Sequence, residues 1–537
     1  MVVESRGETF LLVTGGRGRM SALDFKTGDE AWGVALPVGK GLLPFTVATP
    51  VRVGQHVFIA YGGFDPSVSK DPLANVPSRQ EHLVAALDLE ARQLDRAFAP
   101  VTLAGGLPAT LGEGMVTFNP PTQLVRGALQ HMPGDGTLGH VYIAAGNKGD
   151  IQPWHGWVFE IDLERWRADG PGAAISARLL TTPELDCGEE GTSGMHDMVC
   201  GGGVWTPAGP QIFETPDGHE VLVPTGNGHL DLTKGMYANG LLRMGRGLRF
   251  DPGCSERACA DFDPINPSRE CLESCSDLFV PRLAGGDPPL RPEGGDCDGL
   301  SFYECYAELD YDFGANAPAR VELPSGRVVY VQPSKDGHVY VIDAAHMGRM
   351  LARQKVTDPC GTKQDPCQRS WTGMIVTQPN VLEVDDGLLV LVPTFMYDAT
   401  HPAGVVALAI EEDGDDVRLR PVWRAPRLGS EEARRRFRSH PSRIAISGEG
   451  AERIAWVVDV FGFRNGKDVA AERRKSGKGD LLGIRVRDGE IVERIQLRGR
   501  GERYLIPTVR DGMIYVGSCG SDAGPSFVEG YRLPDRD

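Results

Sequence analysis

The chain repeats one pattern of short β-rich segments about eight times along its 537 residues. In each unit, a β-rich run ends in small residues and glycine, a second run ends near an aspartate, and a turn leads into a third run. The first unit reads LLVTGG and then MSALDFKTGDEAWGV, and the fifth reads RVVYVQPSKDG and then HVYVIDAAHMGRMLARQ. Such a unit cannot bury both faces of its own sheet, so neighbouring units must pack around an axis. The repeat predicts an all-β fold, a single β-propeller of eight four-stranded blades over residues 1–537, with seven blades as the alternative.

The two ends of the chain bear on how such a ring closes. The first unit lacks a recognisable first strand, and the last unit stops after its third run, at Tyr531 to Leu533. A propeller protects its open sheet edges when one terminus completes the blade of the other. We expect either residues Met1 to Phe10 to do this or an upstream strand to be missing from this chain.

Composition excludes several classes of partner. The 56 Lys and Arg residues against 73 Asp and Glu residues give a net charge of −17, and an acidic surface repels phosphate backbones, which argues against nucleic acid. Two basic runs, Arg434 to Arg443 and Arg464 to Lys478, are interpreted as solvated loops or a short surface helix. No stretch reaches 18 consecutive apolar residues, so no membrane span is expected.

Ten of the eleven cysteines fall into close sequential pairs within loop-like sequence, which fits disulfides formed under oxidising conditions. Proximity alone pairs Cys187 with Cys200, Cys297 with Cys305, and Cys360 with Cys367. The leftover Cys519, in the run MIYVGSCG, is expected to be a small buried thiol. The first residues carry no secretion signal. We therefore expect an exported protein (periplasmic, cell-surface or secreted) whose signal peptide is not present in this chain.

Residues 251–309 are expected to be a Cys-rich loop insertion within the propeller. Its Cys254, Cys259, Cys271 and Cys275 leave the pairing open. Four thiolates suit tetrahedral Zn²⁺, but neither spacing is the tight C-x₂-C of most structural zinc sites, so disulfides are the favoured interpretation.

Several segments resemble the pyrroloquinoline quinone (PQQ) dehydrogenases. The first unit's ALDFKTGDEAW is similar to the blade signature of that family, in which an Asp, a Thr-Gly turn and a Trp recur. The turn requires glycine and the indole docks between blades. Trp32 follows the signature closely and Trp423 more loosely.

Between Val141 and Leu351 the resemblance implies individual roles. AAGNKGDIQPWHGWVFEID is similar to the segment whose acidic residue binds calcium, and GGGVW followed by PTGNG to the segment with a tryptophan floor and a metal-binding asparagine. ELDYDFGANAP is similar to the segment of the catalytic base, and SKDGHVYVID to that of the cation at the quinone carbonyl. The residues implied are Asp150 (metal), Trp205 (PQQ floor), Asn227 (metal), Asp310 (base and metal, with Asp312 as the alternative) and Lys335 (catalysis and PQQ).

The chemistry of these residue types is coherent with the resemblance. Oxygen atoms of Asp and Asn are the ligands that Ca²⁺ prefers, and a bound cation polarises a quinone carbonyl. A carboxylate can take the proton of an alcohol, and a lysine can stabilise charge on the reduced quinone. The resemblance therefore implies PQQ and calcium as cofactors.

Departures from that family favour a different function. The chain has no adjacent cysteine pair and no haem-attachment motif, and Asn227 is followed by Gly228 instead of proline. HGWVFEID, TGNG and KDGHVYVIDAAHMG are similar to bacterial exported PQQ-like repeat proteins of unassigned activity, in which such motifs hold blades together. We expect an exported binding or scaffold module that contacts a protein or glycan through its loop-rich face. The alternative is a PQQ- and Ca²⁺-dependent dehydrogenase oxidising an alcohol or sugar.

Three histidines, His155, His196 and His229, lie near the segments just described. Together they could bind a transition metal. No fixed ligand spacing supports this, so we interpret them as solvent-facing loop residues.

Overall fold

A computed structural model describes most of the chain and separates it into two compact units. The described residues are 1–537 except 16–17, 74–77, 111, 150–151, 188–199, 217, 282–299, 309, 358–374, 376, 395–403, 438–440, 463–477, 503, 520–525 and 534–537. The first unit comprises Met1–Pro292 and Cys297–Ala317, and the second comprises Pro318–Asp537 with Glu293–Asp296.

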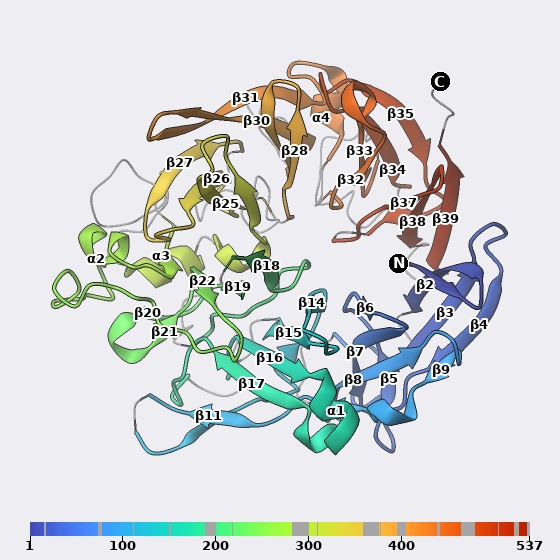
Figure 1. The fold of residues 1–537 in the computed structure, drawn as a ribbon, viewed down its shortest axis with the longest axis horizontal. Coiled ribbons are helices and arrows are strands. Elements are labelled where there is room, and N and C mark those ends of the chain that lie inside the picture. The colour runs from blue at the N-terminus through green and yellow to red at the C-terminus, as the bar shows by residue number, and fades with distance from the viewer. Residues whose placement is uncertain are drawn as a thin grey trace. The chain divides into compact units, whose positions relative to one another are not determined.

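The first unit contains four larger antiparallel sheets in chain order (Figure 1). They are built from β1 (Val2–Ser5), β2 (Glu8–Gly15), β3 (Arg19–Asp24) and β4 (Glu30–Ala35); β5 (Leu43–Phe45), β6 (Val51–Val53), β7 (His56–Phe64), β8 (Gln80–Asp88), β9 (Gln93–Leu94) and β10 (Val101–Thr102); β13 (Gln123–Leu124), β14 (Gln130–Met132), β15 (His140–Asn147), β16 (Trp157–Asp162) and β17 (Ile175–Leu180); and β18 (Gln211–Thr215), β19 (Gly218–Pro224), β22 (Leu241–Met244) and β23 (Leu278–Phe279). Two small hairpins, β11 (Gly106–Pro108) with β12 (Met115–Thr117) and β20 (Leu230–Asp231) with β21 (Met236–Tyr237), accompany them.

The second unit contains four further antiparallel sheets, again in chain order (Figure 1). They are built from β24 (Ala319–Glu322), β25 (Val328–Pro333), β26 (His338–Asp343) and β27 (Met350–Lys355); β28 (Asn380–Val384), β29 (Gly387–Thr394), β30 (Gly404–Asp413) and β31 (Asp416–Ala425); β32 (Ala445–Ser447), β33 (Ile454–Asp459), β34 (Asp480–Arg485) and β35 (Ile491–Gln496); and β36 (Arg500–Gly501), β37 (Thr508–Arg510), β38 (Met513–Cys519) and β39 (Ser526–Arg532).

The core of each unit lies between neighbouring sheets. Strand β7 shows why, because successive side chains of a strand point to opposite faces and both faces of β7 are buried. Val57, Ile59 and Tyr61 pack with side chains of the first sheet. Phe58 and Ala60 pack with side chains of the third sheet. An unbroken apolar run thus indicates a sheet covered on both sides, as in a stack of blades.

The blade signature in DFKTGDEAW forms the turn that the sequence predicts. Oδ1 of Asp24 accepts hydrogen bonds from the backbone N–H groups of Lys26 (2.9 Å) and Thr27 (2.8 Å). Gly28 has φ of 78°, a left-handed conformation that favours glycine. The Trp32 ring then packs edge-on against Phe10, with ring centroids 5.8 Å apart. The signature therefore ties the β3–β4 turn to the face of its own sheet.

These sheets confirm the predicted fold class, an all-β arrangement of eight β-propeller blades. Helices in the described residues are short: α1 (Leu163–Asp169), α2 (Arg269–Glu273), α3 (Phe302–Glu308) and α4 (Glu431–Arg435). None of the helices in the part of the chain that the structure describes is long and apolar enough to cross a membrane.

Two expectations about which segments form strands need correction. The first blade does have its first strand, because β1 pairs with β2 from Val2 opposite Leu11 to Ser5 opposite Glu8. Residues 251–309 are more than a loop, since they contribute β23, whose Phe279 lies opposite Leu241 of β22.

Candidate functional site

Trp205 occupies a fixed position between the third and fourth sheets of the first unit. The backbone N–H of Val204 donates to the carbonyl oxygen of Ala145 in β15 (3.2 Å), and Gly226 donates to Gly203 (2.9 Å). A Cβ at Gly146 would lie only 2.7 Å from the Cβ of Trp205, so the glycine permits this close approach. The end of β15 (AAGN) and the TGNG segment that follows β19 thus contact the GGGVW segment.

Both polar and aromatic parts of the Trp205 side chain are engaged. Its Nε1–H donates to Oδ2 of Asp312 at 2.8 Å. The guanidinium carbon of Arg126 lies 4.4 Å from the ring centroid, a cation–π contact on one face of the indole. The other oxygen of Asp312, Oδ1, accepts from the backbone N–H of Gly314 (2.7 Å) at the start of a short 3₁₀ helix, Phe313–Ala315.

Asn227 and Asp310 form a second buried pair. Nδ2 of Asn227 donates to Oδ1 of Asp310 at 3.4 Å, and the two residues are 6% and 9% exposed. Oδ1 of Asn227 is buried and has no hydrogen-bond partner among the described residues. Asp310 has φ of 52°, a left-handed conformation that is unusual for a residue with a Cβ. The pair therefore includes one unsatisfied acceptor beside a carboxylate.

Glycines bring the two pairs together. A Cβ at Gly226 would lie 3.2 Å from Nε1 of Trp205 and 3.3 Å from Oδ1 of Asp312. A Cβ at Gly314 would lie 2.7 Å from the backbone nitrogen of Gly226. Larger residues at either position would force the TGNG and DFGAN segments apart. We call Trp205, Asn227, Asp310, Asp312 and Arg126 the tryptophan cluster.

Two further residues are implied by the resemblance, Asp150 and Lys335. Asp150 falls outside the described residues. Lys335 belongs to the second unit, in the turn Ser334–Gly337 between β25 and β26, and its side chain is buried at 1% exposure. Their roles beside a quinone stay predictions.

Apart from Cys519, the cysteines in the described residues form disulfides. Cys187 is bonded to Cys200, Cys254 to Cys275, and Cys259 to Cys271. The last two bonds are nested, and they use the four thiols that the zinc alternative required. Cys305 is also disulfide-bonded. The predicted partners Cys297, Cys360 and Cys367 lie outside the described residues.

Cys519 and the histidines differ from expectation. Cys519 is a free thiol, but it is half-buried at the end of β38 and not buried in the core. His155 is only 5% exposed, so its interpretation as solvent-facing was wrong. His229 is largely covered as well, with its Nδ1 lying 3.4 Å from Oε2 of Glu184. His196 lies outside the described residues.

Sequence reasoning missed Arg126 of the tryptophan cluster and a second buried cation, Lys148. Arg126 stands 79 positions before Trp205, and no motif marked it. Lys148 lies in the AAGNKGD segment, is 3% exposed, and its Nζ has no hydrogen-bond partner among the described residues. Burial lowers the pKa of Lys148, and Asp71 raises it in part. The sequence signal for Lys148 was its position in a segment that resembles a metal-binding motif.

The tryptophan cluster offers oxygen ligands that suit a cation. Ca²⁺ binds oxygen ligands, and turning over the Asn227 amide would place its Oδ1 beside the Asp310 carboxylate. A quinone floor requires an open aromatic face, and Arg126 covers one of the two faces of Trp205. Within the cluster, Asn227 and Asp310 would hold a metal ion.

Comparisons with known proteins give similar folds at low identity. No known family model and no functionally curated protein matches this sequence. Among solved structures, a quinohemoprotein alcohol dehydrogenase from Pseudomonas putida is 12% identical over 97% of this chain and 69% of its own, with a TM-score of 0.47. A europium-containing methanol dehydrogenase is 12% identical over 97% and 83% (TM-score 0.48), and BamB from Moraxella catarrhalis 11% over 96% and 93% (TM-score 0.44). Likeness at this identity concerns the fold alone.

Proposed function

We propose that this protein is an extracytoplasmic β-propeller that serves as a binding scaffold for a protein partner. The observation that carries the proposal is the closed state of the tryptophan cluster. Arg126 covers a face of Trp205, Asp312 holds its indole N–H, and Asn227 donates to Asp310. The residues that resemble a cofactor centre here contact one another. Such contacts hold the segments of a repeat scaffold together.

A groove in the second unit supplies a surface for the partner. Its volume is about 890 Å³, and it lies between the end of β31 and the turn that leads into β35. Val422 and Leu428 are 44% and 51% exposed on it, beside Trp423 and Ile491. Exposed large apolar side chains gathered at a recess are typical of a protein-binding site.

The charged residues of the groove indicate which side chains a partner segment would need. Glu432 is paired with Arg436 and Arg494, and Asp488 is paired with Arg485. Arg427 is exposed and has no ion-pair partner among the described residues. We therefore expect a partner segment with an apolar side chain next to a carboxylate, so that the carboxylate meets Arg427 and the apolar group meets Leu428.

Site-specific crosslinking tests this surface in the native host. A photoreactive phenylalanine analogue replaces Leu428 in one variant and Ile265, which is 54% exposed in the first unit, in a matched control. The scaffold proposal expects a discrete crosslinked species from position 428, weakened by R427E and absent from position 265. Equal crosslinking at both positions, or none at 428, would contradict it.

One observation favours a second candidate function, a PQQ- and Ca²⁺-dependent dehydrogenase. Oδ1 of Asn227, beside Asp310, is a buried acceptor without a hydrogen bond among the described residues, and an amide oxygen is a ligand that Ca²⁺ accepts. When bound, PQQ would supply the hydride or electron acceptor, and Asp310 would be the group that takes the proton of an alcohol. Dye reduction after reconstitution with PQQ and Ca²⁺, abolished by D310N and by K335A, would establish this function and remove the scaffold proposal.

The proposal places the protein in an oxidising compartment, and the disulfides support this part of it. Protein purified from its own host under denaturing conditions should alkylate at Cys519 before reduction and at all cysteines after it. Alkylation of Cys187 and Cys254 without reductant would place the protein in a reducing compartment instead.

A further inference from the structure

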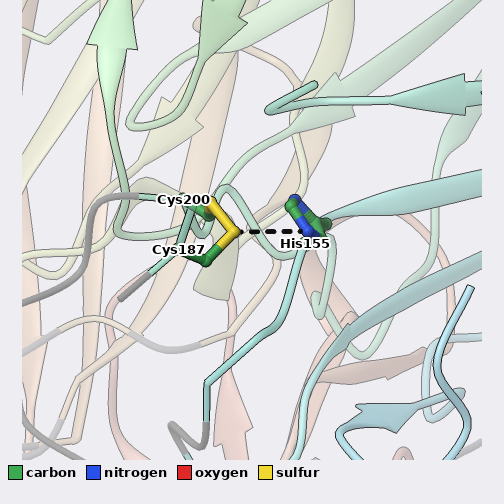
Figure 2. A group of neighbouring side chains, drawn as sticks. All are labelled: His155, Cys187 and Cys200. Carbon is green, nitrogen blue, oxygen red and sulfur yellow. Dashed lines mark hydrogen bonds between the residues drawn. A yellow bond between two sulfur atoms is a disulfide. The ribbon is translucent and has the colours of Figure 1, made fainter. Parts of the chain in front are cut away.

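His155, Cys187 and Cys200 form a compact buried group in the first unit, separate from the groove (Figure 2). One ligand atom from each residue lies within 4.8 Å of the other two. All three residues are at most 5% exposed. Nε2 of His155 is 3.5 Å from Sγ of Cys187, and a dashed line joins the two side chains in Figure 2. Two sulfurs and one imidazole nitrogen are a ligand set typical of Zn²⁺.

A hydrogen bond determines which ring nitrogen of His155 carries the proton and which one presents its lone pair to Sγ of Cys187. Nδ1 lies 2.8 Å from the carbonyl oxygen of Thr182, and a carbonyl oxygen can only accept. Nδ1 therefore carries the proton, and Nε2 presents its lone pair to Sγ of Cys187. Burial lowers the pKa of His155 to about 4, so the ring is neutral at neutral pH. Metal-binding histidines commonly donate their second ring N–H to a carbonyl in this way.

In the oxidised state, this lone pair has no hydrogen-bond donor among the residues that the structure describes. A disulfide sulfur has no hydrogen, so the contact between Nε2 and Sγ of Cys187 is not a hydrogen bond while Cys187 and Cys200 are joined. A buried acceptor without a donor is costly and calls for an explanation. A thiol or a metal ion at this position would satisfy it.

We propose that reduction of the Cys187–Cys200 disulfide creates a Zn²⁺ site whose ligands are Nε2 of His155 and the two cysteine thiolates. An external dithiol supplies two electrons and two protons, the S–S bond breaks, and the dithiol leaves as its own disulfide. Zn²⁺ then displaces the two thiol protons to solvent as both sulfurs coordinate. The fourth ligand is a water molecule, which makes the site open.

Backbone contacts hold the ligands ready. Gly156 N–H donates to the carbonyl oxygen of Gly201 (3.0 Å), and Gly201 N–H donates to that of Trp154 (3.2 Å), so His155 and Cys200 are carried by paired segments. In a tetrahedral zinc site, ligand atoms lie about 3.5–3.8 Å apart, given Zn–N and Zn–S distances of about 2.0–2.3 Å. The Nε2–Sγ distance of 3.5 Å already matches. Only the two sulfurs must separate.

Zinc stoichiometry measured on the full chain tests the site. Wild type, H155Q and the matched control H131Q are compared with and without a phosphine reductant, which takes its oxygen from water as it is oxidised. His131 is a partly buried histidine whose Nε2 lies 2.7 Å from the carbonyl oxygen of Leu138. We expect reduced wild type and H131Q to bind one more Zn²⁺ per chain than reduced H155Q, and all oxidised forms to bind equally. Thiols elsewhere contribute equally to every reduced sample and cancel.

A second variant guards against misfolding of H155Q. C187S combined with C200S keeps His155 but has no thiolate at the site, and it should also bind one Zn²⁺ fewer than reduced wild type. Cobalt(II) in place of zinc should give thiolate charge-transfer absorption that both variants lose. Equal zinc binding by reduced wild type and H155Q, or by reduced wild type and the double serine variant, would overturn the proposal. Neither outcome depends on partner binding at the groove.

Discussion

The two units each bury a polar cluster, and the clusters differ in how their cation is paired. In the second unit, Arg436 lies 2.7 Å from Asp480, 3.2 Å from Glu432 and 3.6 Å from Asp459, with its side chain 6% exposed. Burial alone would lower the pKa of Arg436, but the bonds to these carboxylates raise it above its ordinary value. In the first unit, the cation of the tryptophan cluster, Arg126, lies over the ring of Trp205, and Oδ1 of Asn227 has no hydrogen bond among the described residues.

Neither cluster satisfies every buried polar atom, because the carboxylate oxygens of Asp459 also lack a hydrogen bond among the described residues. A buried cation that is paired with three carboxylates nevertheless holds their segments together. Unsatisfied buried atoms mark places where an ion or a further ligand can be accommodated. We therefore expect the Arg436 cluster to matter for stability and the tryptophan cluster to respond to added ligands, though weakly.

The largest effect is expected from removing the cation of the second unit. R436M leaves Asp480 and Asp459 buried without their partner, which should lower the free energy of unfolding by about 3–5 kcal/mol. Chemical denaturation of wild type and R436M measures it. R420M, which breaks the exposed pair between Arg420 and Glu411, is the matched control. A loss in R436M no larger than in R420M would show that the buried cluster is not structural.

Acid should weaken the first unit before the second. His82 is buried, and burial lowers its pKa to about 4, although bonds to backbone carbonyls such as that of Gln123 raise it in part. The unfolded chain takes up a proton near its ordinary pKa, so stability falls from about pH 6.5 to about pH 4, by roughly 3 kcal/mol in all. Hydrogen exchange at pH 7 and pH 4.5 measures this for each unit. H82Q should flatten the dependence and H131Q should not; identical pH profiles for wild type and H82Q would contradict the explanation.

A smaller loss is expected when Trp205 no longer donates to Asp312. W205F removes a hydrogen bond to a charged acceptor, a change expected to cost about 1.5–3 kcal/mol, whereas W456F removes a bond to the neutral Oγ of Ser447 and should cost about 1 kcal/mol. Thermal and chemical unfolding of both variants give the comparison. If W456F proved the more damaging of the two, the indole–carboxylate bond would not anchor the cluster.

The smallest effect is expected from calcium. Asn227 and Asp310 offer few of the six to eight oxygens that Ca²⁺ takes, so millimolar Ca²⁺ should stabilise the protein by less than about 1 kcal/mol. Unfolding temperatures with Ca²⁺ and with a chelator measure this, and N227A should remove the whole effect. Stabilisation by several kcal/mol would indicate a complete metal site and favour the dehydrogenase.

The repeat pattern was sufficient to predict the fold because each blade is a local unit. The prediction failed in two kinds of place. In one, a local pattern was misread, and in the other, a contact between segments far apart in the sequence determines the structure. The first strand was missed although the Arg6-Gly7 turn, with φ of 52° and 77°, is a hairpin turn that sequence can indicate. By contrast, β23 joins its sheet only after a long insertion, so no local pattern marks it.

The candidate site was less predictable because its contacts join distant segments. Motifs placed Trp205, Asn227 and Asp310 in one unit, but the cation over Trp205 comes from Arg126, which no motif marks. His155 lies in loop sequence, and its ring contacts Thr182 and Cys187, which stand 27 and 32 positions further along the chain. Sequence spacing likewise cannot distinguish the nested bonds Cys254–Cys275 and Cys259–Cys271 from other pairings.

Calorimetric titration of the full chain with PQQ in the presence of Ca²⁺ tests the central claim most directly, that the tryptophan cluster is closed by its own residues. We expect no saturable heat of binding from wild type, because Arg126 covers a face of Trp205 and Asp312 holds its indole. Binding of one PQQ per chain that disappears in W205A would contradict the account.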